Sequence, residues 1–227
     1  MNASQGQEFV QQLGQSKARF FEVDVTDTSS IEHAVTETME WAKETGAELG
    51  GVIPAAGVGL PAKILNRNNK PFDMVSFDFV INVNLRGTID LVRQVLPHLL
   101  QVNPAQPDGE RGAVILVSSA AAFEGQPGQV AYSASKGAIV SLTLPLAREL
   151  AGSGIRVATI APSLFESPMT AKLGDKAHKS LERVMEFPVR AGKPDEFARL
   201  VKECLENSML NGTVVRLDGA MRMPSKM

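Results

Sequence analysis

The sequence predicts an α/β fold in which a parallel β-sheet is covered by helices on both faces. Segments with the apolar periodicity of strands and of helices alternate along the chain, which is typical of βαβ units. Strand-like segments such as AVILV within 113–119 are apolar throughout, as expected for strands buried on both faces. The chain has 227 residues, 44% hydrophobic and 21% charged, so it can form one domain with a sizeable core and is neither disordered nor fibrous.

Apolar periodicity and turn residues place five elements in the first half of the chain. The third, a helix, shows the i, i+3, i+4, i+7 repeat most clearly, and we expect Thr28 or Ser29 to be its N-terminal cap. The fifth, also a helix, is expected to break at Gly87 and Pro97. The expected order is a helix ending at Gly14, a strand at 19–25, a helix ending at Gly46, a strand at 49–55 within an apolar run that extends to 57, and a helix at about 74–100.

The second half continues the alternation after a turn-rich connector at 103–112. The expected order is a strand at 113–119, a helix at 130–150, a strand at 155–161, a short helix at about 175–185, a helix at 194–207 and a strand at 213–219. Ligands of such sheets bind beyond the carboxyl ends of the strands, which makes the residues that follow each strand the first candidates for a site.

Composition excludes several functions. The formal charge of −2 argues against a nucleic-acid partner, and no apolar run reaches the roughly 18 residues of a membrane span. The first residues resemble neither a signal nor a transit peptide. A single cysteine, Cys204, excludes an intrachain disulfide, and the scattered His33, His98 and His178 suggest no metal site. Neither a GxSxG elbow nor a GxxxxGK[ST] phosphate loop is present.

Three residues form the strongest candidate for catalysis. Ser119 ends an apolar strand, and Tyr132 and Lys136 lie one turn apart on the next helix, where the i, i+4 spacing places them on one face. Tyrosine has a pKa of about 10, and a nearby ammonium favours the phenolate that a general base requires. Ser119 could hold the substrate oxygen. The alternative is a surface helix that happens to carry YxxxK, a common pattern.

The segment VSSAAAFEGQPGQVAYSASKGAIVSLT and the segment NVNLRGT at 82–88 resemble the active-site motifs of the short-chain dehydrogenase/reductase family. The resemblance implies a catalytic set of Asn84, Ser119, Tyr132 and Lys136. Tyr132 would be the base, and Lys136 would lower its pKa and orient the cofactor ribose. Asn84 would support a proton-relay water; alternatively it is a buried amide that satisfies helix backbone.

The same resemblance implies where a nicotinamide cofactor would bind. IAPSLFESP at 160–168 matches the segment beside the nicotinamide, DVTD at 24–27 matches the adenine-binding turn, and PAAG at 54–57 stands where the family has NNAG. Asp24 would meet the adenine amine, although it could equally be a helix cap. The implied cofactor-binding residues are Asp24, Val25, Ala55, Gly57, Tyr132, Lys136, Pro162, Phe165 and Ser167.

The resemblance runs from about residue 1 to residue 223 and is greatest to family members that oxidise 3-hydroxyacyl-CoA, and sometimes steroids, with NAD. It implies an oxidoreductase that interconverts a secondary alcohol and a ketone. Gln126 and Gln129 would face this small-molecule substrate or, alternatively, are solvated loop residues. It also implies a homotetramer built through the helices at about 74–100 and 130–150. NAD rather than NADP rests on those relatives alone.

One departure from the family is large. The first strand, glycine-rich turn, helix and strand of the family have no counterpart, and a GxGxxA match at Gly57, Gly59 and Ala62 is interrupted by Pro61. We therefore expect one domain, residues 1–227, with a three-layer, Rossmann-like, doubly wound parallel sheet that is truncated at its N-terminus. The missing strands would lie between those at 19–25 and 49–55. The alternatives are a non-catalytic truncated member that acts as an oligomer subunit, or an incomplete gene model.

The last three residues, Ser225, Lys226 and Met227, resemble the SKL peroxisomal address, although chance also produces such tails. We expect a peroxisomal location, with a mitochondrial one as the alternative and a cytoplasmic one not excluded.

Overall fold

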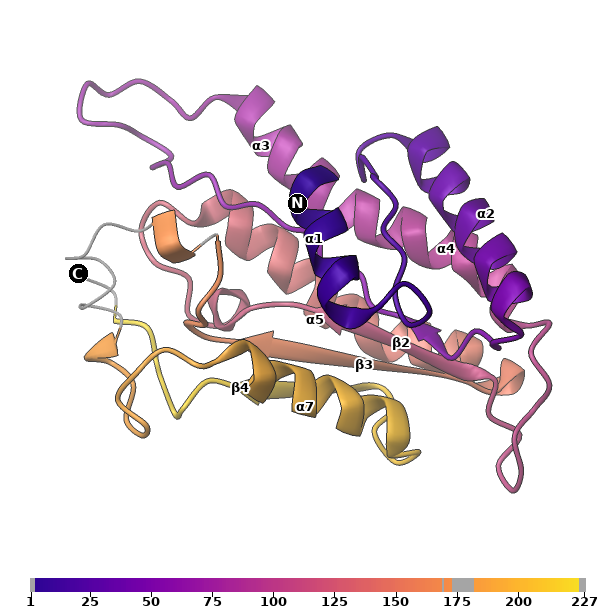
Figure 1. Ribbon diagram of the computed structural model, residues 1–227. Coiled ribbons are helices and arrows are strands. Elements are labelled where there is room, and N and C mark those ends of the chain that lie inside the picture. The colour runs from indigo at the N-terminus through magenta and orange to yellow at the C-terminus, as the bar shows by residue number, and fades with distance from the viewer. Residues whose placement is uncertain (1–2, 169, 173–181, 225–227) are drawn as a thin grey trace.

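A computed structural model describes residues 3–168, 170–172 and 182–224 of the chain. Its centre is a four-stranded parallel sheet in the order β1 (Gly51–Val52), β2 (Gly112–Val117), β3 (Ile155–Pro162) and β4 (Thr213–Leu217) (Figure 1). The predicted parallel α/β fold is confirmed. Within the described residues the strands follow one another in chain order, as they do in one half of a doubly wound sheet.

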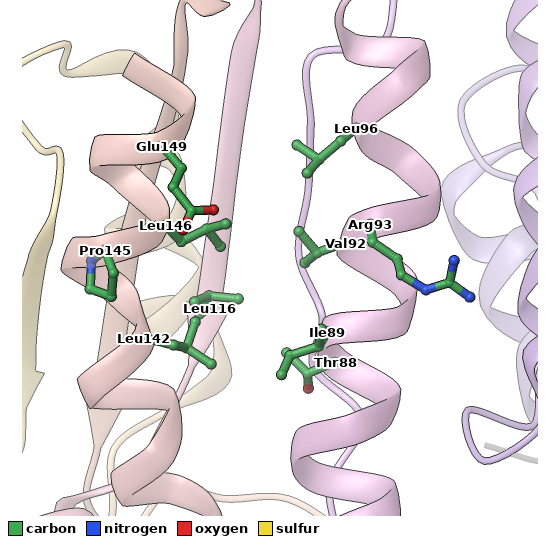
Figure 2. A pocket seen from close by; sticks show the side chains of 10 residues that line it. All are labelled: Thr88, Ile89, Val92, Arg93, Leu96, Leu116, Leu142, Pro145, Leu146 and Glu149. Carbon is green, nitrogen blue, oxygen red and sulfur yellow. The ribbon is translucent and has the colours of Figure 1, made fainter. Parts of the chain in front are cut away.

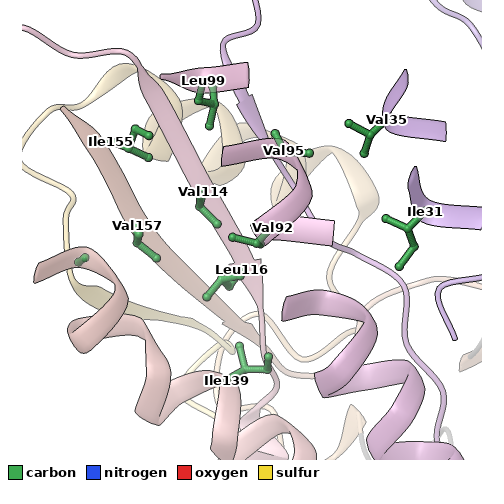
Figure 3. Close-up of a cluster of buried hydrophobic side chains, with 11 residues drawn as sticks. Ile31, Val35, Val92, Val95, Leu99, Val114, Leu116, Ile139, Ile155 and Val157 are labelled. Carbon is green, nitrogen blue, oxygen red and sulfur yellow. The ribbon is translucent and has the colours of Figure 1, made fainter. Parts of the chain in front are cut away.

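Helices cover both faces of the sheet and make it the middle of three layers. One face packs against α2 (Thr28–Thr45), α4 (Gly87–Leu99) and α5 (Val130–Leu150), and the other packs against α7 (Pro194–Glu206). Figure 3 shows the first interface, where side chains of β2 and β3 point toward α4 and α5. Its buried members are Ile31, Val35, Val92, Val95, Leu99, Val114, Leu116, Ile139, Ala147, Ile155 and Val157.

Strand β2 shows why its sequence carries no polar alternation. Val114 and Leu116 join the cluster under α4 and α5, whereas Ala113 and Ile115 join the cluster under α7. Successive side chains of a strand point to opposite faces, so a strand covered on both sides needs apolar residues at every position.

Residues 19–25 do not form the predicted strand and lie outside the sheet. Strand pairing needs a neighbouring backbone, and the described residues offer none between this segment and β1. Instead the segment packs on α4. A Cβ atom at Gly87 would lie 2.5 Å from the Val25 carbonyl oxygen, so a glycine is needed there for close approach.

The predicted helix at 74–100 is irregular at a different place from the one expected. It consists of α3 (Met74–Ile81), a π-helical turn (Asn82–Arg86) and α4, and neither Gly87 nor Pro97 breaks it. Pro97 lies within the last turns of α4. The extra residue of a π-turn often marks a functional site, and this one contains Asn84.

The remaining boundaries agree closely with the prediction apart from one strand, since β1 is only Gly51–Val52, and one helix cap. The first helix, α1 (Ala3–Leu13), ends before Gly14, which has φ +93°. Helix α2 is capped by Asp27, whose carboxylate accepts a hydrogen bond from the Ser29 N–H, so neither Thr28 nor Ser29 is the cap.

Two predictions fall largely outside the described residues. Residues 173–181 include most of the short helix expected at 175–185, and residues 225–227 carry the tail on which the location rests; both stay predictions. In the part of the chain that the structure describes, no helix is long and apolar enough to cross a membrane. The same part brings together no group of three or more metal-binding side chains.

Candidate active site

The predicted catalytic residues lie together at the carboxyl edge of the sheet. Ser119 follows β2 by two residues and begins a short 3-10 turn (Ala120–Ala122), where its hydroxyl accepts the Ala121 N–H at 3.1 Å. Tyr132 and Lys136 lie in the first two turns of α5. A strand end and a helix start therefore meet at this point, as expected for a ligand site of a parallel sheet.

Lys136 is buried beneath this edge. Its Nζ atom donates a hydrogen bond to the Val117 carbonyl at 2.9 Å and lies 5.9 Å from the centre of the Tyr132 ring. Only 5% of the residue is exposed, and burial lowers the pKa of its ammonium to about 8. A lysine with a pKa in this range can hold or release a proton near neutral pH.

Burial of this charge leads to a stability prediction. The pKa of Lys136 is below its usual 10.5 in the folded state, so folding disfavours the charged form, by about 3 kcal/mol below pH 8 and less as pH rises toward 10.5. The Lys136→Met substitution removes this cost, but it also removes the hydrogen bond to the Val117 carbonyl, which contributes about 1 kcal/mol to stability. We expect Lys136→Met to raise the free energy of unfolding by about 2 kcal/mol at pH 7, measured by urea denaturation.

The matched control is Lys202→Met, because the Lys202 side chain is 70% exposed and should change the unfolding free energy by less than about 0.5 kcal/mol. The gain from Lys136→Met should shrink when both proteins are compared above pH 8. If Lys136→Met were no more stable than the parent protein at pH 7, burial of the Lys136 charge would not carry the free-energy cost given above.

Tyr132 is partly exposed and lies beside Ser119. Burial raises the pKa of its phenol by more than the Ser119 hydroxyl lowers it, so the net direction is upward. The expectation that Lys136 lowers this pKa is therefore not met in the structure as it stands. The physical reason is that the ammonium points to the Val117 carbonyl rather than to the phenol oxygen.

Asn84 is completely buried and ties the loop after β1 to the helices. Its Oδ1 atom accepts the Val58 N–H at 2.8 Å, and its Nδ2 donates to the Val58 carbonyl at 2.9 Å and to Ser135 Oγ at 3.0 Å. The Ser135 hydroxyl in turn donates to the Tyr132 carbonyl at 2.8 Å. Asn84 thus satisfies loop backbone, not the helix backbone of the alternative reading, and a water-relay role stays a prediction.

Sequence reasoning missed Ser135 and Val58 as members of this network. Ser135 lies three residues after Tyr132, and this i, i+3 spacing on a helix was an available signal. The contact at Val58 is made by its backbone N–H and carbonyl, so the identity of the side chain at this position does not indicate it.

Gly57 lies over the catalytic residues. A Cβ atom there would come within 3.5 Å of both Asn84 Oδ1 and Lys136 Nζ, while Ala55, two residues earlier, is exposed. The strand end at 54–57 therefore borders the site, as predicted, although it lacks the asparagines of the family motif.

The predicted nicotinamide segment follows β3, which ends at Pro162. The Phe165 ring is already packed: a Cβ atom at Gly192 would lie 2.5 Å from it, and the Phe197 ring meets it edge-on at 6.1 Å. Ser167 is exposed, and its hydroxyl pairs with Thr170 Oγ1 at 3.0 Å. The cofactor roles of Pro162, Phe165 and Ser167 stay predictions.

The predicted adenine turn lies apart from these residues, before α2. The Asp24 carboxylate accepts hydrogen bonds from the Thr26 N–H at 2.9 Å and the Thr26 hydroxyl at 2.7 Å, which lower the pKa of Asp24. Since Asp27 caps α2, the helix-cap alternative for Asp24 is wrong. Val25 contacts Gly87 of α4.

The two glutamines of the loop before Tyr132 differ in burial. Gln126 is only 6% exposed, and its Nε2 atom donates to the Pro224 carbonyl at 3.2 Å, so it is not a solvated residue. The Gln126 N–H donates to Gln129 Oε1 at 2.8 Å, which closes the loop on itself. Gln129 is half-buried at the start of α5.

The parallel sheet and the tyrosine, lysine and serine at its carboxyl edge define a dehydrogenase-type α/β protein. Comparison with known proteins agrees with this class: a family model described as short chain dehydrogenase matches residues 1–178. The chain belongs to the short-chain dehydrogenase family.

Individual relatives match over nearly the whole chain. The bovine protein named 3-hydroxyacyl-CoA dehydrogenase type-2 is 45% identical over 221 residues, covering 97% of this chain and 82% of the bovine protein. Its Drosophila melanogaster namesake is 42% identical, with 97% of this chain and 85% of that protein covered. A crystal structure of the Mycobacterium avium 3-hydroxyacyl-CoA dehydrogenase type-2 superposes with a TM-score of 0.90 at 36% identity, over 99% of this chain and 84% of that one.

A more distant structure agrees in fold. It is a 3-ketoacyl-(acyl-carrier-protein) reductase from Brucella melitensis complexed with NADH, with a TM-score of 0.80 and 23% identity over 98% of this chain and 85% of that one.

Proposed function

We propose that this protein is an NAD-dependent oxidoreductase that interconverts a 3-hydroxyacyl-CoA and the corresponding 3-ketoacyl-CoA. The observation that carries the proposal is the grouping of Ser119, Tyr132 and the buried Lys136 at the carboxyl edge of the sheet. The names of the relatives that match along the chain support the substrate class.

In the proposed oxidation, Ser119 holds the alcohol oxygen, and Tyr132 takes the alcohol proton after it has first lost its own phenolic proton to solvent. The raised pKa of Tyr132 keeps the phenol protonated at neutral pH, which suits return of a proton to the ketone in the reverse direction. Lys136 supplies positive charge behind the phenol, and its lowered pKa suits it to passing that proton onward. Asn84 fixes the loop above them.

The donor set fits the nicotinamide and ribose half of a dinucleotide. Tyr132 and Lys136 offer a hydroxyl and an ammonium, and Gly57 leaves space over both of the buried polar groups beside it. When bound, NAD would accept the hydride that leaves the alcohol carbon. The bound NADH of the Brucella melitensis reductase supports NAD as the cofactor, and NADP stays the alternative.

The rival is a family member that binds sister subunits without turnover. Titrating the purified protein with NADH and following nicotinamide fluorescence separates the two. Saturable binding is expected of the enzyme. A folded circular dichroism spectrum without saturable binding would contradict the proposal.

We also propose that the protein is a homotetramer that associates in part through α4 and α5. Figure 2 shows an apolar groove between these helices, with leucine and valine side chains pointing into it from both sides. Ile89, which lines this groove, is 47% exposed. An exposed apolar groove of this kind is typical of a protein interface, and the matching helices of a second copy would cover it.

The Ile89→Glu variant tests the interface. We expect it to lower the molar mass in light scattering by at least half without lowering the helix content, because a charge would be buried at the contact. An unchanged molar mass would place the interface elsewhere, and a parent protein that is already monomeric would refute self-association.

A further inference from the structure

The loop that carries the candidate substrate residues is exposed in its middle, although its ends are buried. We call residues 119–129 the substrate loop. Gly125 and Pro127 of this loop are exposed, Phe123 is 45% exposed and Gly128 adopts φ +95°. Such a loop needs contacts from outside to keep one conformation.

Helix α5 supplies part of these contacts, and the end of β4 with the residues after it, which we call the C-terminal segment (residues 216–224), supplies the others. Arg216 donates two parallel hydrogen bonds to Glu124, from Nη1 to Oε1 at 2.7 Å and from Nη2 to Oε2 at 2.8 Å. Ninety-two positions separate the two residues in sequence. A two-pronged pair of this geometry fixes orientation as well as distance.

Two further charges complete the cluster. Arg216 Nε donates to Asp218 Oδ2 at 2.6 Å, Arg222 Nη1 donates to the same oxygen at 3.0 Å, and Arg222 Nε lies 3.4 Å from Glu124 Oε1. The side chains of Arg216, Glu124 and Asp218 are only 22%, 24% and 10% exposed, so solvent screens them less than surface pairs. The bond from Arg216 holds the pKa of Glu124 below its usual value and keeps it charged.

Three contacts other than ion pairs join the same two segments. The Arg216 guanidinium lies 4.9 Å from the centre of the Phe123 ring. Ala120 and Met221 are completely buried in one cluster with Met185. Gln126 donates to the Pro224 carbonyl. Contacts thus occur along the loop from Ala120 to Gln126, between the candidate catalytic serine and the candidate substrate glutamines.

We propose that Glu124 and Arg216 are positioning residues, which clamp the substrate loop to the C-terminal segment so that Gln126 is held in place for the acyl chain of a 3-hydroxyacyl-CoA. This inference rests on the proposed function. The ion pair is separate from the proton-transferring groups, so it acts on substrate binding rather than on the chemical step.

The test is Glu124→Gln, which keeps the shape of the side chain and removes its charge. We expect KM for the 3-hydroxyacyl-CoA to rise about tenfold, kcat to change less than about threefold and NADH affinity to stay the same. Arg216→Lys should give the same result, because a lysine cannot reach Glu124 and Asp218 together, and the double variant should be no worse than either single one.

The matched control is Glu44→Gln, which removes an exposed pair with Arg19 (3.0 Å, side chains 64% and 42% exposed) and should leave KM unchanged. Hydrogen exchange gives a second readout that needs no substrate. In Glu124→Gln, amides of the substrate loop should exchange at least tenfold faster while those of β2 keep their protection.

Unchanged KM together with unchanged exchange of the substrate loop would overturn the proposal, as would equal effects on kcat and KM. If the parent protein oxidises no 3-hydroxyacyl-CoA, the proposed function fails, and the exchange measurement still decides whether Glu124 and Arg216 clamp the loop.

Discussion

Replacing Tyr132 with phenylalanine is expected to lower kcat about a thousandfold and to leave the affinity for NADH almost unchanged. The change removes a single oxygen atom, the one that we propose exchanges the proton with the substrate, and keeps the aromatic ring. General acid–base catalysis by a positioned side chain contributes about 10²–10⁴ to the rate, which sets the size of the effect. Steady-state kinetics and fluorescence titration of the same preparation provide the two numbers.

The control for this variant is its thermal stability. The ring of Tyr132 stays in the Phe variant, so its contacts with neighbouring side chains should persist and the thermal unfolding temperature should change little. Turnover within tenfold of the parent would refute Tyr132 as the proton-transferring group.

The largest effect on stability is expected at Arg156. This side chain is 8% exposed and donates hydrogen bonds to Glu110 and to the carbonyls of Cys204, Leu205 and Leu210. It therefore satisfies the carbonyls at the end of α7 and binds them to β3. Arg156→Met would leave Glu110 and those carbonyls without their partner, and we expect the free energy of unfolding to fall by about 3–5 kcal/mol in urea denaturation.

Arg199→Met is the matched control for Arg156→Met. Arg199 also pairs with an acid, Asp195, at 3.0 Å, but its side chain is 72% exposed. A surface pair of this kind contributes less than about 1 kcal/mol. Similar losses for the two variants would show that burial is not what makes Arg156 important.

The regular part of the fold follows from sequence because its signals are local. β2 is apolar from Ala113 to Val117, and α5 spans Val130–Leu150 as predicted. Residues 19–25 show the limit of this reasoning. Their pattern suits a strand, but a strand also needs a neighbouring backbone, and pattern alone cannot supply it.

The candidate site divides in the same way. Ser119, Tyr132 and Lys136 were predictable because a strand end and a helical i, i+4 spacing bring them together. The direction in which Lys136 points was not, since it depends on the Val117 carbonyl. Nor was the pairing of Glu124 with Arg216, because residues 92 positions apart meet only through the folding of β4 beside β3.

The π-helical turn at Asn82–Arg86 could not be predicted from the sequence either. Its residues have ordinary helical propensity, so the extra residue per turn leaves no mark in the composition. It is imposed by packing, where the buried Asn84 amide bonds the Val58 backbone on one side and Ser135 on the other.

One measurement tests the central claim most directly: the purified protein is mixed with NAD and a 3-hydroxyacyl-CoA, and the absorbance of reduced nicotinamide is followed beside the Tyr132→Phe variant. The account predicts that NADH and 3-ketoacyl-CoA form in equal amounts with the parent protein and at a rate lower by about a thousandfold with the variant. A folded parent protein that binds NADH but forms neither product, or a variant as active as the parent, would contradict it.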